Sequence, residues 1–391
     1  MVKKRLKTII AGSKLINRYV HFTYRYLNNI NEFKKAKGAL RKFIELKGEV
    51  PLISDNVSLS YELTLKCNLK CKMCYGLRFR EDVFSRDRST YSELGFDQVI
   101  KVLKNSNISN VSFVGNEVLL RNDLFLILDY LKNKNVRFSI LTNGILINND
   151  TVSKLINFGA SLTTIVISLD GTKAIHDRIR NSNNAFEQAC RGIKLATSHF
   201  NVILNTTIMQ ENLHDLKGVV DIAHLLGVKN IDFSLEYWCS DEEIEETKKI
   251  LNREFNWQDP IISVYNKQGT EYSFQELRLR LNELRNYSYN KGIFITISPA
   301  QEYLKKYFSK EIKPVEGIIC KKLLFPNPRV DYKGDFIFCQ ALRKSWGNLT
   351  EKTAKEVWES KEFLDFRWKL YKIGMLPICK RCCKLCTIFC K

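Results

Sequence analysis

Between residues 58 and 237, apolar runs of strand length alternate with segments whose apolar residues recur at helical spacing. The strand-like runs are 59–65, 111–114, 138–141, 164–169, 202–208 and 231–235, and the helical patterns between them are 93–105, 123–134, 150–158, 185–198 and 213–226. Six strands alternating with five helices predict an α/β fold with parallel strands and right-handed crossovers. Because a closed barrel needs eight such units, we expect a partial (β/α)6 TIM-like barrel.

The barrel region has three flanking segments, which give four expected domains. Residues 1–55 form a helical extension, 56–240 the barrel core, 241–314 linker helices and one strand, and 315–391 a small C-terminal α+β domain. The linker contains an acidic helical stretch (241–246), a charged helix (274–285) and a strand (292–298). The C-terminal domain contains a hairpin-like run at 330–336, a helix at 354–370 and a cysteine-rich tail.

The N-terminal extension is basic and amphipathic. Apolar residues recur at near-helical spacing over 6–26 among many Lys and Arg, and a second helix is predicted over 31–46. Such a helix packs on the main domain, contacts a substrate or lies on an anionic membrane surface. Packing is the commonest of these outcomes, and peripheral membrane contact through residues 1–28 is an alternative.

Polar and glycine residues follow the predicted strands. They are Cys67 after the first strand, then Gly115-Asn116-Glu117, Thr142-Asn143-Gly144, Asp170-Gly171 and, after the sixth strand, Glu236-Tyr237. The C-terminal ends of parallel strands meet at one rim, where ligands of such folds bind. We therefore expect the functional site on this rim.

The twelve cysteines of the chain are clustered. Cys67, Cys71 and Cys74 lie within eight residues, and five more lie between Cys379 and Cys390. In a reducing compartment such clustering indicates metal ligation. The first group has no fourth cysteine nearby, which leaves one metal position open for chemistry. Cys190 and Cys239 are predicted to be ordinary buried or partly buried thiols.

The formal net charge is +20, and residues 1–50 hold 13 Lys or Arg against 3 Glu. Two explanations fit this excess of positive charge equally well. One is a biased composition with a solvated basic face, and the other is a basic surface that meets an acidic partner. Charge alone gives only non-specific nucleic-acid affinity, and the chain has no recognised nucleic-acid-binding motif, so nucleic acid is not a favoured partner. No apolar run reaches the roughly eighteen residues of a membrane span. We expect a cytoplasmic protein that associates at most with the surface of a membrane.

Four ordered motifs carry a family resemblance. Cys67, Cys71 and Cys74 match the CxxxCxxC signature of radical S-adenosylmethionine (SAM) enzymes. Residues 115–123 (GNEVLLRND) resemble the family's GGEPLLRxD run, with Asn116 for its second Gly and Val118 for Pro. Residues 141–144 (LTNG) resemble its third-strand motif, and 167–171 (ISLDG) with His176, Asp177 and Arg180 resemble its SLDG…HDxxR segment.

The resemblance implies a [4Fe–4S] cluster held by Cys67, Cys71 and Cys74, with SAM chelating the fourth iron. Reductive cleavage would give a 5′-deoxyadenosyl radical that takes hydrogen from the substrate. An electron donor such as flavodoxin or ferredoxin is implied as a partner. The implied cofactor contacts are Gly115, Asn116 and Glu117 to the methionine amine, Ser168 and Asp170 to the ribose, Arg180 to the carboxylate, and Met73 and Tyr75 to the adenine. His176 is expected to donate a structural hydrogen bond rather than to act in catalysis.

The C-terminal third resembles the SPASM or shorter twitch extension, which holds auxiliary iron–sulfur clusters. The matching segments are Cys320, 334–339 (GDFIFC), 346–348 (WGN), 357–360 (VWES) and 379–382 (CKRC). Cys320, Cys339, Cys379 and Cys382 would complete one cluster, and a zinc ribbon is the alternative. Cys383, Cys386 and Cys390 would begin a second auxiliary cluster.

These observations predict a radical SAM enzyme with a peptide or protein substrate, which it oxidises or crosslinks. The alternatives are a lipid or other small-molecule substrate, and a non-catalytic iron–sulfur or zinc protein that binds nucleic acid.

Overall fold

The computed structural model describes residues 38–50, 52, 58–77, 79, 92–300, 303–312, 319–324, 327–382 and 385–386. The basic helix expected over 6–26 lies outside these residues, as do Cys383 and Cys390. Of the second expected N-terminal helix, residues 38–45 are described and are helical.

A ten-stranded sheet organises the chain, in the order β13-β12-β11-β1-β2-β3-β4-β5-β6-β9. The six strands predicted from the sequence pair in parallel with their neighbours in chain order. They are β1 (Ser58–Tyr61), β2 (Asn110–Phe113), β3 (Arg137–Thr142), β4 (Leu162–Ser168), β5 (Val202–Ile208) and β6 (Asn230–Leu235). The expected partial barrel is therefore confirmed.

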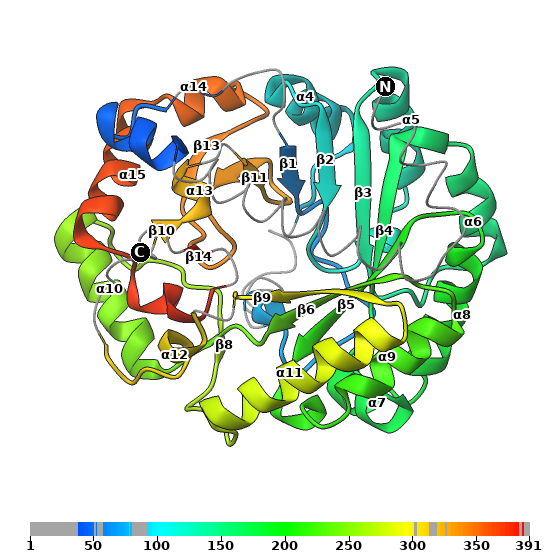
Figure 1. Ribbon diagram of the computed structural model, residues 1–391. Coiled ribbons are helices and arrows are strands. Elements are labelled where there is room, and N and C mark those ends of the chain that lie inside the picture. Colours follow the sequence, from blue (N-terminus) through cyan, green and yellow to red (C-terminus); the bar gives the residue numbers. More distant parts are fainter. Residues whose placement is uncertain are drawn as a thin grey trace, which may run out of the picture.

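Helices cover the outside of this sheet (Figure 1). Five of them match the helical patterns of the sequence: α4 (Phe96–Ser106), α5 (Leu124–Asn133), α6 (Asn149–Ile156), α8 (Ala185–Thr197) and α9 (Leu216–Leu225). A sixth, α7 (Lys173–Arg180), follows β4 and was not expected as a helix. Short 3₁₀ turns occur at Val118–Leu120, Gly159–Ser161 and Gln210–Asn212.

Two further strands extend the parallel sheet at both edges. β9 (Phe294–Ser298), from the expected linker, pairs in parallel with β6 after the long helix α11 (Phe274–Asn290). β11 (Arg329–Val330), from the expected C-terminal domain, pairs in parallel with β1. The C-terminal domain therefore continues the barrel sheet, which brings its residues to the same rim as the Cys67–Cys74 loop.

The two faces of the sheet differ in polarity. On β5, the alternate residues Val202, Leu204, Thr206 and Ile208 are buried, whereas Asn205 and Thr207 are partly exposed on the concave face. Ser112 and Ser139 occupy the matching partly exposed positions of β2 and β3. A parallel sheet covered on both faces has nearly continuous apolar strands. The alternation here indicates that only the outer face is packed against helices.

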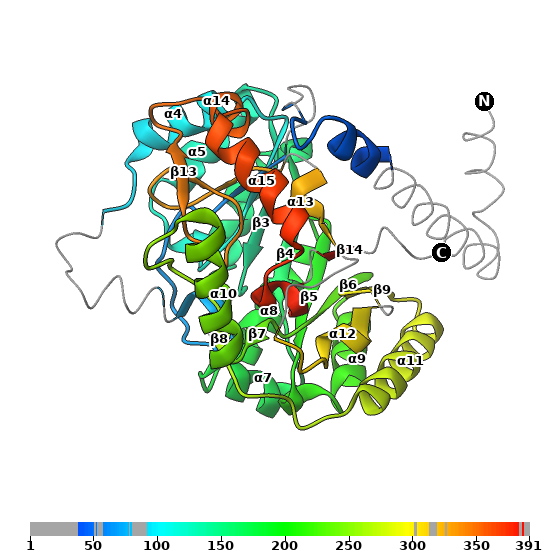
Figure 2. The same ribbon diagram turned by 90° about the vertical axis from the view of Figure 1, so that its left-hand side faces the viewer.

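The C-terminal domain adds an antiparallel hairpin and helices (Figure 2). β12 (Asp335–Ile337) pairs with β11 and with β13 (Ser345–Asn348). The single helix expected over 354–370 is two helices, α14 (Ala354–Trp358) and α15 (Lys361–Ile373). They are separate because Ser360 caps α15, accepting a hydrogen bond from the Phe363 amide at its Oγ (3.4 Å).

The helix α10 and several short elements complete the named elements of the structure. They are β7 (Trp238–Cys239), β8 (Tyr265–Asn266), α10 (Asp241–Phe255), α12 (Leu304–Tyr307), β10 (Ile319–Cys320), α13 (Lys321–Leu324), the 3₁₀ helix η7 (Pro377–Arg381) and β14 (Leu385–Cys386). Among the helices described, we find none with the length and apolar character that a membrane crossing requires.

Candidate functional site

The three cysteines of the loop after β1 line one cavity of about 200 Å³ at the C-terminal ends of the strands. Cys71 is buried, and Cys67 and Cys74 are partly exposed. The cavity is also lined by further residues predicted to contact the cofactor, namely Met73, Tyr75, Gly115, Asn116, Ser168 and Arg180. Residues far apart in the sequence therefore converge on the cysteines, as the fold requires of a rim site.

Arg180, at the end of α7, contacts a cysteine of this loop directly. Its Nη1 donates to Cys71 Sγ at 3.6 Å, and its Nη2 lies 2.6 Å from Asp170 Oδ2. Asp170 is fully buried, so the ion pair fixes the guanidinium. The guanidinium therefore holds a charged hydrogen-bond donor at the sulfur of Cys71, one of the three candidate metal ligands.

Asp170 lies behind the cavity and is not part of its lining. Its Oδ1 accepts a hydrogen bond from the Thr207 amide at 2.8 Å, and its backbone amide donates to His176 Nδ1 at 3.0 Å. His176 accepts rather than donates this hydrogen bond. Burial, with the nearby Arg180, lowers the pKa of His176 to about 4, so the imidazole is neutral near pH 7. The ribose contact of Asp170 stays a prediction, whereas Ser168 does line the cavity.

Of residues 115–117, Gly115 and Asn116 line the cavity and Glu117 does not. Gly115 has φ +89°, and a Cβ there would lie 3.0 Å from Glu62 Cγ, so the position requires glycine. Asn116, which replaces the expected glycine, donates from Nδ2 to the Thr64 carbonyl at 3.2 Å. Glu117 is fully buried and does not line the cavity.

Glu117 instead ties the end of β2 to the end of β3. Its carboxylate accepts hydrogen bonds from Thr142 Oγ1 and the Asn143 amide, both at 2.8 Å. Burial raises the pKa of this carboxyl above its usual value. Its expected contact with the methionine amine stays a prediction.

The sequence interpretation missed an ion-pair cluster that borders the cavity. Glu62, one residue beyond β1, is buried between Arg329 of β11 and Arg343 of the C-terminal domain. Glu62 Oε2 lies 2.5 Å from Arg343 Nη1, and both residues line the cavity. A glutamate inside an apolar strand pattern was a signal of a paired buried charge. Arg343 had no comparable sequence signal.

The four cysteines assigned to an auxiliary cluster line a second, small cavity of about 30 Å³. Cys320 comes from β10, Cys339 follows β12, and Cys379 and Cys382 come from η7 and its end. Tyr237, directly after the barrel strands, lines the same cavity. The structure therefore brings together four thiols that are separated by up to 62 positions in the sequence.

Thiolates are soft ligands that suit iron–sulfur clusters or zinc. Within the residues that the structure describes, no three His, Cys, Asp or Glu side chains are arranged to hold a single metal ion. A cluster distributes its cysteines over several irons and so needs a wider set of thiols than one zinc ion does. The donor sets of both cavities fit iron–sulfur clusters.

The remaining cysteines differ in what the structure describes. Cys386 lies in β14, paired with β10, and only its backbone is described. Cys190 is half-buried and Cys239 fully buried, and burial raises the pKa of these thiols to about 11 and about 12. Both are therefore protonated near pH 7 in this structure, as expected of ordinary thiols.

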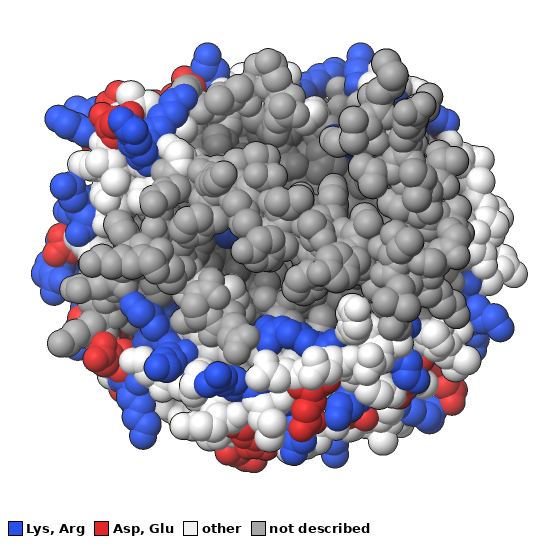
Figure 3. All heavy atoms as spheres, viewed as in Figure 1, with Lys and Arg blue, Asp and Glu red and all other residues white. Residues whose placement is uncertain are grey.

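The Lys and Arg side chains that the structure describes do not form one patch on the face shown in Figure 3. Lys and Arg side chains spread around the described edge of this face and are interspersed with Asp and Glu. A nucleic-acid interface usually concentrates its cations on one face or groove. This part of the surface gives that alternative no support.

Two family models match the chain. The radical SAM superfamily model matches residues 61–223, and an iron–sulfur cluster-binding domain model, SPASM, matches residues 320–383. The first covers β2 to β5 and the three cysteines Cys67, Cys71 and Cys74. The second contains all four cysteines of the small cavity.

Curated relatives match about half of the chain or less. Fe-coproporphyrin III synthase of Methanosarcina barkeri is 32% identical over 174 residues, which are 44% of this chain and 42% of the relative. The subtilosin biosynthesis protein AlbA of Bacillus subtilis is 27% identical over 184 residues, 46% of this chain and 39% of the relative. The chain thus spans less than half the length of these relatives.

Solved structures share the fold over most of the chain. The structure of Streptococcus suis SuiB bound to the precursor peptide SuiA has a TM-score of 0.59 at 15% identity. The alignment covers 93% of this chain and 77% of SuiB. At this identity the likeness shows the fold alone.

Proposed function

We propose that this chain, an enzyme of the radical SAM superfamily with a C-terminal SPASM domain, modifies a peptide. Its radical SAM domain implies a [4Fe–4S] cluster and SAM, and its SPASM domain implies auxiliary iron–sulfur clusters. The bound cofactors supply a radical able to take a hydrogen atom from an unreactive C–H bond of the substrate. The substrate and the contacts of individual residues are the proposal.

The residues of the three-cysteine cavity would bind and orient the cofactors. Cys67, Cys71 and Cys74 would hold three irons, and Arg180 would donate a hydrogen bond to Cys71 Sγ while reaching the cofactor carboxylate. Gly115 and Asn116 would meet the methionine amine, Ser168 the ribose, and Met73 and Tyr75 the adenine. Glu117 and Asp170, which lie behind the cavity lining, would keep these groups in place through buried hydrogen bonds and the Arg180 ion pair.

The residues of the small cavity would hold one auxiliary cluster. Cys320, Cys339, Cys379 and Cys382 supply four thiolates, enough for a cluster with no open position. A cluster of this kind can accept an electron from a substrate radical, which is thereby oxidised. Cys383, Cys386 and Cys390 remain candidate ligands of a second one.

The observation that carries the peptide proposal is the polar concave face of the sheet beside the three cysteines. Asn205 and Thr207 line the cavity, and Ser112 and Ser139 lie further along the same face, with 2.9 Å between their hydroxyls. Amide and hydroxyl groups can bind the backbone and polar side chains of a peptide. A separate cavity of about 910 Å³ along α10 shares Phe79 with the three-cysteine cavity and offers room for a longer substrate.

Similar proteins support the same class. AlbA is a bacteriocin biosynthesis protein, and SuiB is seen with a precursor peptide. A tetrapyrrole is the second candidate, favoured by the 32% identity to Fe-coproporphyrin III synthase. A macrocycle, however, is recognised mainly by broad apolar contact, which the Ser-, Thr- and Asn-rich face does not offer. A lipid substrate rests only on the N-terminal segment outside the described residues.

The test is co-expression of the chain with short open reading frames from its own genomic neighbourhood. Mass spectrometry should find a peptide that has lost hydrogens through oxidation or crosslinking, and the change should be absent with the Cys71→Ala variant. In parallel, the same cells are analysed for Fe-coproporphyrin III, the product that the similar synthase is named for. Formation of this porphyrin that is lost with Cys71→Ala, without any modified peptide, would contradict the peptide proposal and favour the second candidate.

A further inference from the structure

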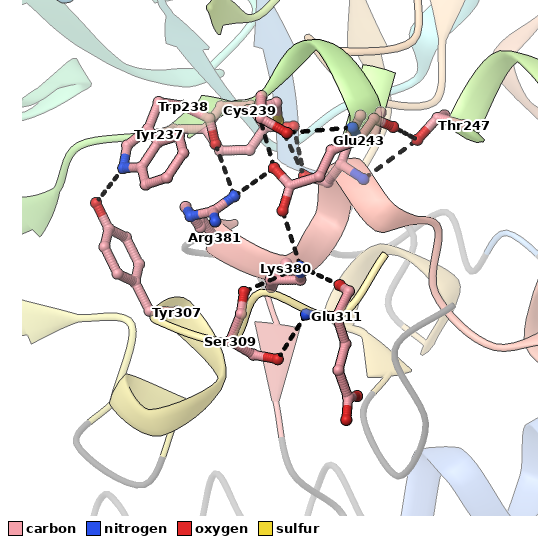
Figure 4. Close-up of polar contacts among 12 residues, drawn as sticks. Tyr237, Trp238, Cys239, Glu243, Thr247, Tyr307, Ser309, Glu311, Lys380 and Arg381 are labelled. Atoms are coloured by element: carbon pink, nitrogen blue, oxygen red, sulfur yellow. Dashed lines mark hydrogen bonds and ion pairs between the residues drawn. The ribbon is translucent and has the colours of Figure 1, made fainter. Parts of the chain in front are cut away.

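A buried charge cluster lies outside the small cavity and holds the loop that carries two of its cysteines. Lys380 and Arg381, the two residues between Cys379 and Cys382, are 4% and 5% exposed. Both contact Glu243 of α10, which is 3% exposed. Glu243 Oε1 lies 2.8 Å from Lys380 Nζ, and its Oε2 lies 2.5 Å from Arg381 Nη1. One carboxylate therefore pairs with both cations of the CxxC loop (Figure 4).

Each cation has a second anchor. Lys380 Nζ donates to the carbonyls of Ser309 and Glu311. The Arg381 guanidinium lies 3.5 Å from the centre of the Trp238 ring, a cation–π contact. Together these contacts join α10, β7 and the segment after α12 to the loop, as Figure 4 shows.

The backbone before the loop is fixed by the same helix. The Ile378 amide donates to Thr247 Oγ1 at 3.3 Å, and the Ile378 carbonyl accepts from Tyr237 Oη at 3.0 Å. Thr247 and Glu243 are one helical turn apart on α10. This helix, expected only as part of a linker, therefore supports η7 through a side-chain hydrogen bond and through an ion pair.

The net charge of Glu243, Lys380 and Arg381 would also affect the reduction potential of the auxiliary iron–sulfur cluster. The buried charge cluster holds two cations and one anion, a net charge of +1, and both cations lie within two residues of both cysteines. A positive charge near an iron–sulfur cluster stabilises its reduced form and so makes its reduction potential more positive. Glu243 offsets part of that effect. Removing its charge alone would leave two cations unopposed.

We propose that Glu243 is a positioning residue for the auxiliary cluster: it fixes the loop of Cys379 and Cys382 and moderates the potential of the cluster they bind. The inference rests on the proposed assignment of Cys320, Cys339, Cys379 and Cys382 as ligands. Residues that orient metal ligands through hydrogen bonds or ion pairs typically contribute tenfold or more to metal affinity.

The test uses the full chain with Cys67, Cys71 and Cys74 replaced by Ala, so that only auxiliary iron is measured after anaerobic reconstitution. Glu243→Gln should lose iron to a chelator about tenfold faster than the parent. Its midpoint potential, from an EPR-monitored redox titration, should be more positive. Glu242→Gln, at the exposed neighbouring position of α10, is the matched control and should behave as the parent.

Two further variants distinguish the loss of contacts that position the loop from the loss of charge. Glu243→Asp keeps the charge with a shorter side chain, so it should lose iron faster while its potential stays close to that of the parent. Thr247→Val removes the acceptor of the Ile378 amide together with the donor to the Glu243 carbonyl, and it leaves the charges unchanged. It should also speed iron loss without moving the potential. Circular dichroism checks that each variant is folded.

Distinct outcomes would overturn the inference. If Glu243→Gln matches Glu242→Gln in both iron loss and potential, the positioning role is wrong while the ligand assignment stands. If Glu243→Gln does not fold, Glu243→Asp and Thr247→Val decide the question. The positioning role is then wrong if both of these variants lose iron no faster than the control. If the triple-Ala parent itself binds no iron, the ligand assignment fails and this inference with it.

Discussion

Arg343 of the C-terminal domain pairs with Glu62 at the end of the first barrel strand, with 2.5 Å between Arg343 Nη1 and Glu62 Oε2. Arg329 of β11 contacts the same carboxylate from the neighbouring strand. Because Glu62 and Arg343 both line the three-cysteine cavity, the ion-pair cluster joins the two domains at the candidate active site. The cavity is therefore built by both domains.

Replacing this carboxylate should destabilise the protein. Glu62→Gln leaves two buried arginines facing each other, and breaking a buried ion pair in this way costs about 3–5 kcal/mol of unfolding free energy. SAM binding should weaken too, because Arg343 loses the partner that fixes it in the cavity. Urea unfolding and equilibrium dialysis measure these effects. Glu351→Gln, at an exposed position, is the control, and equal unfolding midpoints for both variants would contradict the prediction.

The same pair predicts part of the acid sensitivity. Burial alone would raise the pKa of Glu62, but Arg329 and Arg343 outweigh it and lower the pKa to about 2. The stabilisation is then complete above the unfolded value of about 4.5 and is lost as the pH falls from there toward 2. Urea midpoints measured between pH 6 and 3 should therefore fall less steeply for Glu62→Gln than for the parent. Parallel curves for the two proteins would contradict this assignment.

Arg180 should be irreplaceable by lysine. Its planar fork reaches Cys71 Sγ and Asp170 Oδ2 at once, which a single ammonium cannot do. Arg180→Lys should weaken SAM binding about tenfold, measured by equilibrium dialysis with the reconstituted protein. Arg178→Lys, on the exposed side of α7, should bind as the parent does. Equal affinities for the two variants would rule out a role for the guanidinium fork.

His176 predicts a separate pH effect. The folded protein holds this imidazole neutral down to about pH 4, whereas the unfolded chain protonates it below about 6.5. Its contribution to stability is therefore present above pH 6.5 and is lost as the pH falls toward 4. His176→Gln, which can still accept from the Asp170 amide, should show a smaller drop in urea midpoint between pH 7 and 5. An unchanged drop would contradict a neutral buried His176, and His199→Gln serves as the exposed control.

Iron content tests the C-terminal cavity. Replacing Cys320 and Cys339 together should remove about four iron per chain, the content of one [4Fe–4S] cluster. The expected loss follows from their position in the small cavity with Cys379 and Cys382. Cys190→Ala is the matched control, since this thiol lies outside both cavities. Iron content unaffected by the double replacement would refute an auxiliary cluster at these residues.

Local patterns predicted much of the fold. Strand-length apolar runs and helical periodicity located six parallel strands and five helices, because each element forms from its own stretch of sequence. The two added strands were missed as parts of this sheet. The pairing of β9 with β6 and of β11 with β1 depends on partners distant in the chain, and short strands carry no sequence signal for their neighbours.

The candidate site likewise contains residues that the sequence identified and residues that it could not identify. Cysteine spacing identified the three thiols of the three-cysteine cavity, and the motifs identified Gly115, Ser168 and Arg180 beside them. Glu117 and Asp170 come from the same motifs but lie behind the cavity lining, since burial of their carboxylates is decided by packing. Arg343 could not be predicted, because its place at the cavity depends on how the two domains join.

The production of 5′-deoxyadenosine tests the central claim most directly. The chain is reconstituted anaerobically with iron and sulfide, reduced, and incubated with SAM, and the nucleoside is measured by liquid chromatography. The parent should form 5′-deoxyadenosine, and Cys71→Ala, which lacks one of three cluster ligands, should form none above background. No 5′-deoxyadenosine from the parent, or equal amounts from both proteins, would contradict radical SAM chemistry at this site.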